Sequence, residues 1–589
     1  MPSTLTQTVR YGRTPARSYH ARLSRRLPSP LLGASPSWAT RLSFRARYLR
    51  NSQSDLARSE ASGARVNSVP PPPEELQVEA ELSSEDIRPR TRVRGASTIV
   101  SDLASVSGAR LASAVISVAT VIMTTRILVP SQYALVAYVA VVAALMFTTT
   151  SGWTAAAVTR YGREELELTG RMTSTSWNRL LLTAPLILTS IAVIVILRVA
   201  GALPAEMTWL FVGLAIVSGL LFIASEHIVT LLEAAGRMRL TAVALTLRQC
   251  VSTAVLLVIF VSGRGRSPQV IIAVGAIALA IVVIFMATRV WAIALWPPMI
   301  DRALMRRMLV FSIPLIAFSA SQYLIQSVDI VILRAYGTPT EAGIYAVAYQ
   351  GYSVLQQVAT TATIVLTPLF VSLAAAKKQA LLGRYVSRAI PQLVFLSAVA
   401  AGLVVPFLGV AVPIVFGAPF AEAARPLAVL FTAFVLYASA SFSAPILILN
   451  ERTRAVAIIS VAGAAINIAG DILFIGPMHL GVLGPALATS LALAVIAAGY
   501  QIAAERCTET RGSRRVMLLA PLIVATLPVL LVGPGVAMAV GIPAAMLATA
   551  AILRWASPFD LSDADLIAKL DMPAAIKRIV LRGLVLTAR

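Results

Sequence analysis

The chain has 589 residues, of which 57% are hydrophobic and only 13% are charged. So little charge on so long a chain excludes a soluble globular protein and predicts a protein that crosses a membrane many times. The formal net charge is +23, but the basic residues gather in the tails and in alternate loops, which favours lipid headgroups over nucleic acid. Two cysteines and three scattered histidines predict neither a disulfide framework nor a metal site, and no cofactor is expected.

Residues 1–95 differ in composition from the rest of the chain. They contain clusters of Ser, Pro and Arg and no sustained apolar period, so we expect a disordered tail. The first 50 residues contain ten arginines and no acidic residue, a pattern shared with organellar transit peptides. A cytoplasmic extension, or a start site assigned too far upstream, explains the same composition.

From residue 97 to 555 the chain is a succession of apolar segments joined by short loops. A bilayer core of about 30 Å is crossed by roughly 20 apolar residues in a helix. The sequence therefore predicts an all-α polytopic membrane protein with about 14 transmembrane helices. We expect them at residues 98–124, 132–158, 180–200, 207–231, 239–262, 268–291, 307–333, 342–371, 386–416, 424–448, 454–475, 481–504, 516–533 and 535–555.

Arginine and lysine alternate along this series of loops. The loops that follow even-numbered helices, with the adjoining helix ends, contain twenty basic residues, whereas those that follow odd-numbered helices contain six. Loops rich in Arg and Lys stay in the cytoplasm. We therefore expect both termini to be cytoplasmic.

Two connections recur along the chain. The segment Glu233–Arg239 before the fifth helix resembles Leu449–Arg454 before the eleventh, and Arg126–Tyr133 resembles Arg334–Ala342. Six helices are thus repeated in one orientation, and repeated halves are how transporters build a central site. We expect a basic tail (1–95), a six-helix half (96–292), a cytoplasmic linker (293–306), a second half (307–505), helices 13 and 14 (506–555) and a cytoplasmic amphipathic tail (556–589).

Four stretches carry a resemblance to a known family. They are Thr124–Tyr133, Leu309–Leu333, Ala342–Tyr349 and Gly481–Thr489. Together they resemble the polysaccharide exporter, or oligosaccharidyl-lipid flippase, branch of the multidrug/oligosaccharidyl-lipid/polysaccharide (MOP) flippase superfamily. The resemblance covers about residues 97 to 555. One departure is Asp471, where we expect a neutral residue such as Asn.

The resemblance implies a fold and a function. The fold is two six-helix bundles around a V-shaped central lumen, with two further helices at the C-terminal end. The function is flipping of undecaprenyl-diphosphate-linked oligosaccharide across the bacterial cytoplasmic membrane for cell-surface polysaccharide, such as O-antigen. The expected partners are this lipid-linked glycan, membrane lipids, and a polysaccharide polymerase and glycosyltransferases.

Two arginines, Arg110 and Arg248, lie within apolar helices. An arginine near the membrane midplane costs at least about 2.5 kcal/mol unless water or an acid receives it. A guanidinium pairs bidentately with phosphate oxygens, so we expect both residues to grip a diphosphate headgroup. The alternative is a structural ion pair with Glu226, Asp329 or Asp471, or a position of Arg110 near the interface.

Polar side chains at helical spacing predict the lining of the lumen. Tyrosine offers a flat apolar face with a hydroxyl, and glutamine both donates and accepts hydrogen bonds, so both suit sugars. The alternative is that these side chains pack in the protein interior. The candidates on the seventh and eighth predicted helices are Gln322, Gln326, Asp329, Tyr345, Tyr349, Tyr352 and Gln356.

Three acids, Glu226, Asp329 and Asp471, lie inside predicted helices. They are candidates for coupling transport to H⁺ or Na⁺, or they balance the arginines. Coupling is not required, because two negative charges moved outward across 100 mV release about 4 to 5 kcal/mol. The main alternative function is a cation-coupled antiporter of drugs or metabolites. A membrane polymerase or glycosyltransferase is less favoured, because the outer loops carry almost no candidate base.

Overall fold

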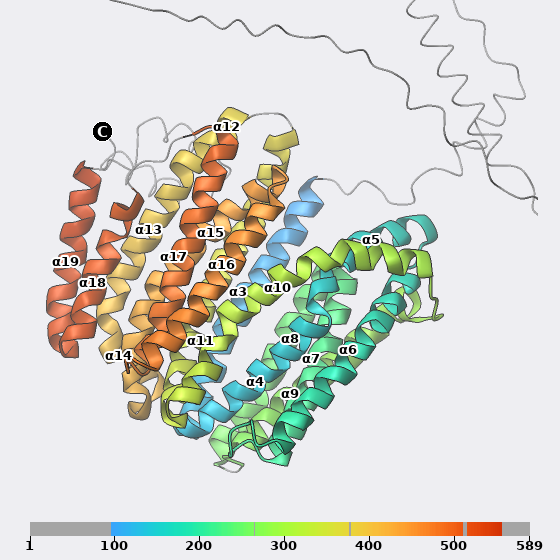
Figure 1. Cartoon of the computed structure of the whole chain (residues 1–589), viewed down its shortest axis with the longest axis horizontal. Coiled ribbons are helices and arrows are strands. Elements are labelled where there is room, and N and C mark those ends of the chain that lie inside the picture. The colour runs from blue at the N-terminus through green and yellow to red at the C-terminus, as the bar shows by residue number, and fades with distance from the viewer. Residues whose placement is uncertain (1–95, 264, 376–378, 511–514, 556–589) are drawn as a thin grey trace, which may run out of the picture. The chain divides into compact units, whose positions relative to one another are not determined.

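Helices account for the regular secondary structure in the described part of the chain, where no strand occurs (Figure 1). The computed structural model describes residues 96–263, 265–375, 379–510 and 515–555. All of them belong to one compact unit, Pro89–Arg589. The predicted tails at residues 1–95 and 556–589 lie outside the described residues. The prediction of an all-α class is confirmed.

Several helices of the first half begin at residues that favour a helix start. Pro130 and Pro268 open their helices, where a missing N–H is not needed and the fixed φ favours the helical backbone. Ser267 caps the second of these, since its hydroxyl accepts from the N–H of Val270. The long helices are α3 (Ala96–Ile127), α4 (Pro130–Thr150), α6 (Thr173–Val199), α7 (Trp209–Ala234), α8 (Met238–Ser262) and α9 (Pro268–Val290).

The second half begins with the cap of Asp301, whose carboxylate accepts from the N–H groups of Ala303 at 2.8 Å and Leu304 at 3.1 Å. Its helices are α10 (Arg302–Tyr336), α11 (Pro339–Ala375), α12 (Gln379–Arg384), α13 (Ile390–Val404), α14 (Leu408–Phe416), α15 (Ala424–Leu449), α16 (Thr453–Ile475) and α17 (Leu483–Thr508). Two further helices follow, α18 (Ala520–Leu531) and α19 (Pro534–Trp555).

Twelve helical segments among the described residues are long and apolar enough to cross a membrane. Their outer faces carry exposed apolar side chains, such as Leu188, Ile196 and Val199 of α6, which only a lipid environment favours. The count of 14 is not confirmed. The two remaining predicted spans correspond to α11 and to the shorter segment Met517–Leu531.

The two halves repeat one packing pattern. In the first half α3 packs against α8, α4 against α7, and α9 against both α7 and α8. In the second half α10 packs against α16, α11 against α15, and α17 against both α15 and α16. Each contact thus recurs between the helices of the same rank, which confirms two six-helix bundles. The appended helices α18 and α19 pack against each other and against α13.

Residues 155–169 form a helix, α5 (Ala155–Thr169), whereas the sequence analysis expected the second helix to run to residue 158 and a loop to follow. Val158 and Tyr161 on one face of α5 are buried. Arg163 and Glu167 form an ion pair one turn apart at 2.6 Å on the other face. The helix ends at Gly170, which has φ +73° and satisfies the left-handed C-cap. The charged residues on the exposed face of such a short amphipathic helix lower its mean hydropathy, so a search for apolar segments does not find it.

Helix α10 belongs to the second half but reaches across to the first. Its contacts include α5, α6 and the short helix η1 (Gly152–Thr154) on one side and α16 and α17 on the other, and Figure 1 shows one end of α10 beside α5. The amide of Asn178 on α6 donates to the carbonyl of Asp301 at 2.9 Å, which fixes this end. The predicted linker therefore ends earlier than residue 306, because α10 begins at Arg302.

The loops define two sides of the protein. We call the side that carries the α4–α6, α7–α8, α9–α10 and α15–α16 connections the arginine-rich side, and the opposite side the arginine-poor side. We expect the arginine-poor side to face outward. In a Cys250→Ser/Cys507→Ser background, a membrane-impermeant maleimide should label Ala202→Cys and Met478→Cys in intact cells but not Thr453→Cys. All three native side chains are exposed, and labelling of Thr453→Cys alone would reverse the orientation.

Candidate functional site

A cavity of about 530 Å³ lies between the first half and α11. Its polar side chains come from four helices: α3, α7 and α8 supply one wall and α11 the other. A space of this size accepts a polar group much larger than a monovalent ion. The lining includes Arg110, Ser113, Ser117, Phe147, Ala155, Glu226, Thr230, Glu233, Leu245, Arg248, Gln249, Gln350, Ser353, Val354 and Gln357.

The structure brings Arg110 and Arg248 into this one cavity, although 138 positions separate them in the sequence. Neither forms a salt bridge within 4 Å of a described acid, and the Nε of Arg110 is buried without a hydrogen-bond partner. Arg248 lies over the ring of Phe222, with its guanidinium carbon 5.7 Å from the ring centre. Both guanidinium groups therefore keep N–H donors free for a ligand.

Glu226 and Glu233 line the same cavity, so the arginines are not alone. The carboxylate of Glu226 lies within electrostatic range of Arg248, Arg179 and Arg110. Two arginines and two glutamates thus line one cavity, where their charges attract one another without a direct ion pair. The alternative hypothesis is a structural ion pair of these arginines with an acid. The structure shows only a longer-range attraction to Glu226.

Arg179 is the buried arginine that sequence reasoning placed in a loop. It is 1% exposed and donates to the hydroxyl of Thr154 at 2.9 Å and the carbonyl of Ser151 at 3.2 Å. Its third contact is the Nδ1 of His227 at 3.3 Å. Since these bonds join α6 to η1 and α7, Arg179 holds the wall that carries Glu226.

The opposite wall uses a face of α11 that sequence reasoning missed. Gln350, Ser353 and Gln357 line the cavity, and their spacing of three and four places them on one side of the helix. The predicted stripe of Tyr and Gln lies on another side. Tyr345 and Tyr352 are buried, and the Gln356 amide donates to the Tyr352 hydroxyl at 2.9 Å.

The remaining predicted residues are also outside the lining of this cavity. Tyr349 packs against the rings of Tyr345 and Tyr352, with centroids 6.2 Å and 5.5 Å apart. Gln322 is half-buried and Gln326 exposed on α10. Their role in substrate binding stays a prediction. The α11 side chains that line the cavity are Gln350, Ser353, Val354 and Gln357, which the predicted stripe did not include.

A second polar cluster lies inside the second half, around Asp329 of α10. One carboxylate oxygen of Asp329 accepts from the hydroxyls of Tyr345 and Thr489, the latter at 2.7 Å. The other accepts from the Asn467 amide at 3.3 Å. The carboxyl group of Asp471 of α16 lies near that of Asp329. Asp329 is 1% exposed and Asp471 is fully buried.

This cluster has more acceptors than donors. Both carboxylate oxygens of Asp471 and the side-chain oxygen of Asn467 are buried without a hydrogen-bond donor. Such oxygens in a protein interior demand a partner, because an unpaired polar group there costs free energy. Two carboxyls side by side must share a proton or enclose a cation. Asp471, the departure from the expected pattern, thus belongs to the second half's interior and not to the cavity.

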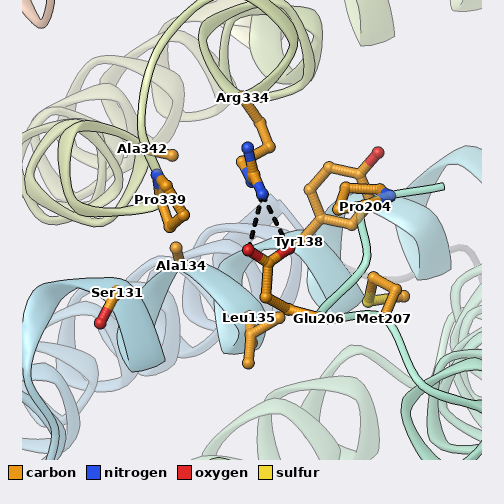
Figure 2. A pocket seen from close by; sticks show the side chains of 10 residues that line it. All are labelled: Ser131, Ala134, Leu135, Tyr138, Pro204, Glu206, Met207, Arg334, Pro339 and Ala342. Atoms are coloured by element: carbon orange, nitrogen blue, oxygen red, sulfur yellow. Dashed lines mark hydrogen bonds and ion pairs between the residues drawn. The ribbon is translucent and has the colours of Figure 1, made fainter.

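An ion pair joins the two halves on the arginine-poor side (Figure 2). Arg334 at the end of α10 donates to both carboxylate oxygens of Glu206 in the α6–α7 loop, at 2.8 and 2.7 Å. Figure 2 shows the pair beside Tyr138 of α4. The pKa of Glu206 is lowered by a backbone hydrogen bond and by Arg334. The pair is therefore expected to stay ionised below the usual carboxyl range.

Two further contacts close the same side. Arg126 at the end of α3 donates to the carbonyl of Ile414 on α14. Gly343 of α11 lies so close to α4 that an added Cβ would collide with the carbonyl of Pro130. The cavity, by contrast, lies near the start of α3 and α8 and the end of α7, which are the ends on the arginine-rich side. The protein is thus closed on the arginine-poor side.

The chain is similar to a known protein family and to solved structures. Residues 99–374 match the family described as "Polysaccharide biosynthesis protein". The solved structure "Lipid II flippase MurJ, inward closed conformation" aligns with a TM-score of 0.58 at 12% identity, over 76% of this chain and 98% of that one. Over residues 99–374 the chain thus resembles this polysaccharide biosynthesis family, and its fold is similar to that of the MurJ structure.

A second solved structure agrees. It is the "Inward-facing conformation of a multidrug resistance MATE family transporter of the MOP superfamily", with a TM-score of 0.52 at 14% identity, over 68% of this chain and 98% of that one. A comparison with curated proteins gives no match. The family match over residues 99–374 agrees with the resemblance seen in the sequence, and at these identities the solved structures establish the fold alone.

Weakening the ion pair should favour opening on the arginine-poor side. An exposed ion pair contributes up to about 1 kcal/mol, so Glu206→Gln should speed labelling of Ser353→Cys from outside by roughly 2- to 5-fold. With Glu206 intact, the labelling rate of Ser353→Cys relative to that of exposed Ala202→Cys, which corrects for the pH dependence of thiol reactivity, should not change between pH 5 and 7, because the lowered pKa of Glu206 keeps the pair ionised. Glu422→Gln, which removes an exposed acid on the same side, is the matched control and should have no effect.

Proposed function

We propose that this protein flips a lipid-linked oligosaccharide of the undecaprenyl-diphosphate type across the bacterial cytoplasmic membrane. The product would serve the synthesis of a cell-surface polysaccharide. The observation that carries the proposal is the pairing of Arg110 and Arg248 in one cavity, with free donors and no salt bridge. Two guanidinium groups suit the two phosphates of a diphosphate, which offers them bidentate acceptors.

The rest of the cavity supports a glycan headgroup. Gln350, Ser353 and Gln357 face the arginines across the cavity, and amides and hydroxyls both donate and accept hydrogen bonds, as sugars do. Glu226 and Glu233 reduce the net positive charge. They lower the affinity of the cavity for a small anion. A tightly bound ligand must therefore also form hydrogen bonds through its hydroxyl groups.

Two sources of free energy are available to this flippase. Outward movement of two negative charges across 100 mV releases about 4 to 5 kcal/mol. The cluster of Asp329 and Asp471 supports an additional coupling to H⁺ or Na⁺, since its unpaired oxygens suit a monovalent cation. This cluster also supports the alternative, a cation-coupled antiporter of drugs or metabolites. Two arginines in the cavity favour an anionic lipid-linked substrate over a positively charged drug or metabolite.

In this proposal the termini and the arginine-rich side are cytoplasmic. The substrate enters from the inner leaflet, where glycosyltransferases assemble it, and leaves toward a polymerase on the outer side. The closed arginine-poor side corresponds to the state that accepts substrate. Opening then requires the Glu206–Arg334 pair and the contact between Gly343 and Pro130 to separate.

The arginines provide the direct test. Arg110→Ala and Arg248→Ala should each abolish glycan export while the protein reaches the membrane in normal amounts, because a charge facing water contributes little to folding. Arg110→Lys and Arg248→Lys should rescue export only in part, since an ammonium keeps the charge and loses the planar fork. Accumulation of the lipid-linked glycan on the inner leaflet of intact cells is the measurement.

The control is Arg452→Ala, which removes an exposed arginine that lines none of the cavities described above. Export should be unchanged in this variant. Normal export by both cavity variants would contradict the proposal. So would loss of export that follows only from loss of protein, because the arginines would then be structural.

The carboxyl cluster gives a separate prediction. If a cation binds between Asp329 and Asp471, Na⁺ or H⁺ should raise the thermal unfolding temperature of the purified protein, because a ligand stabilises the state that binds it. Asp329→Asn and Asp471→Asn should each remove this response, and Glu226→Gln should keep it. A response that survives in both Asp variants but disappears in Glu226→Gln would move the cation site to the cavity.

A further inference from the structure

A basic groove separate from the central cavity lies where α5 meets the first turns of α10. It encloses about 380 Å³ and is lined by Tyr161, Arg306, Arg307, Val310 and Phe311. None of these residues lines the central cavity. The groove is open to the outside of the protein, because Val310 and the two arginines are exposed.

Aromatic rings organise the arginines of this groove. Tyr161 and Phe311 pack edge to face with centroids 5.9 Å apart. The guanidinium carbon of Arg307 lies 4.9 Å from the centre of the Tyr161 ring, and that of Arg160 lies 5.2 Å from the centre of the Phe311 ring. Rings in this position restrict the guanidinium planes and leave their edges, where the N–H donors are, free to bind an anion.

The acids of α5 do not neutralise the whole cluster. Glu164 accepts from Arg307 at 3.2 Å, Glu167 pairs with Arg163 at 2.6 Å, and Glu165 accepts from the N–H groups of Ser174 and Thr175 at the start of α6. Glu164 is therefore engaged with Arg307, and Glu165 and Glu167 are engaged outside the groove. Among the described residues, no hydrogen-bond or ion-pair partner is found for Arg306, which lines the groove, or for Arg160, which lies against the ring of Phe311 at its edge, so two positive charges remain there.

The groove lies at the membrane boundary. The spans on either side of it end at Leu295 and begin at Leu315, so Arg306 and Phe311 fall in the stretch between them. Trp291 and Trp296, stacked on each other with their rings nearly parallel, are both exposed, as is typical of the headgroup level. Below the arginines, Val310 and Ile313 form an exposed apolar strip on one face of α10.

We propose that this groove binds one anionic phospholipid of the leaflet on the arginine-rich side. Arg160 and Arg306 hold the phosphate, and an acyl chain follows Val310 and Ile313. The charge of the groove matches an anionic headgroup, and the apolar strip matches the chain attached to it. The bound lipid would join α5 of the first half to α10, the helix that crosses to the second half. The site does not depend on the proposed transport activity.

The test is lipid binding to the purified full-length protein. Native mass spectrometry of delipidated protein should show one tightly bound phosphatidylglycerol and no comparable binding of phosphatidylcholine. Arg160→Gln/Arg306→Gln should weaken phosphatidylglycerol binding by at least about tenfold, since hydrogen bonds to charged groups contribute about 1.5 kcal/mol or more each. The single change Arg306→Gln, at an exposed and unpaired residue, should weaken it in part without affecting folding.

The matched control is Arg452→Gln/Arg454→Gln, which removes two exposed arginines from the same side of the protein but from no groove described here. It should bind phosphatidylglycerol as the parent does. Equal loss in the two double variants would overturn the proposal, because general charge and not the groove would explain binding. Equal binding of phosphatidylcholine, or retention of phosphatidylglycerol by Arg160→Gln/Arg306→Gln, would overturn it as well.

Discussion

The cost of an unpaired charge in the membrane governs the interior of this protein. An arginine or carboxylate among apolar helices needs water, a hydrogen-bond partner or an opposite charge. Arg179 meets this need through Thr154, Ser151 and His227, and becomes structural. Arg110 and Arg248 meet it through a wet cavity and the field of Glu226. Asp329 meets it through Tyr345, Thr489 and Asn467, whereas Asp471 does not, which leaves its two oxygens to a proton or a cation.

Helix α11 connects the two polar sites. One face presents Gln350, Ser353 and Gln357 to the cavity, and another presents Tyr345 to Asp329. Near its start, Gly343 contacts Pro130 on the closed side. A movement of α11 therefore changes the cavity wall, the carboxyl cluster and the closure together. This shared element is a physical route by which occupancy of the cluster can bias the side to which the cavity opens.

Much of the fold follows from the sequence because hydrocarbon leaves the backbone little choice. Apolar segments of about 20 residues must be helices, and the predicted segments correspond to the helices from α3 to α19. The repeated connections around Arg126 and Arg334 mark halves whose helices pack in the same order. Helix α5 escaped this reasoning because its period is amphipathic and it interrupts a loop. The count of 14 spans is not confirmed, since the described residues contain twelve helical segments long and apolar enough to cross a membrane.

The sequence by itself identified the charges whose burial demands an explanation: Arg110, Arg248, Glu226, Asp329 and Asp471. Only the tertiary structure decided their grouping, because pairing depends on which helix faces meet across distant parts of the chain. It joined Arg110 to Arg248 and Asp329 to Asp471, and it turned Tyr345 and Tyr352 into the core while Gln350 and Gln357 face the cavity. A helix pattern defines a stripe, but the neighbouring helices decide whether that stripe faces water, lipid or protein.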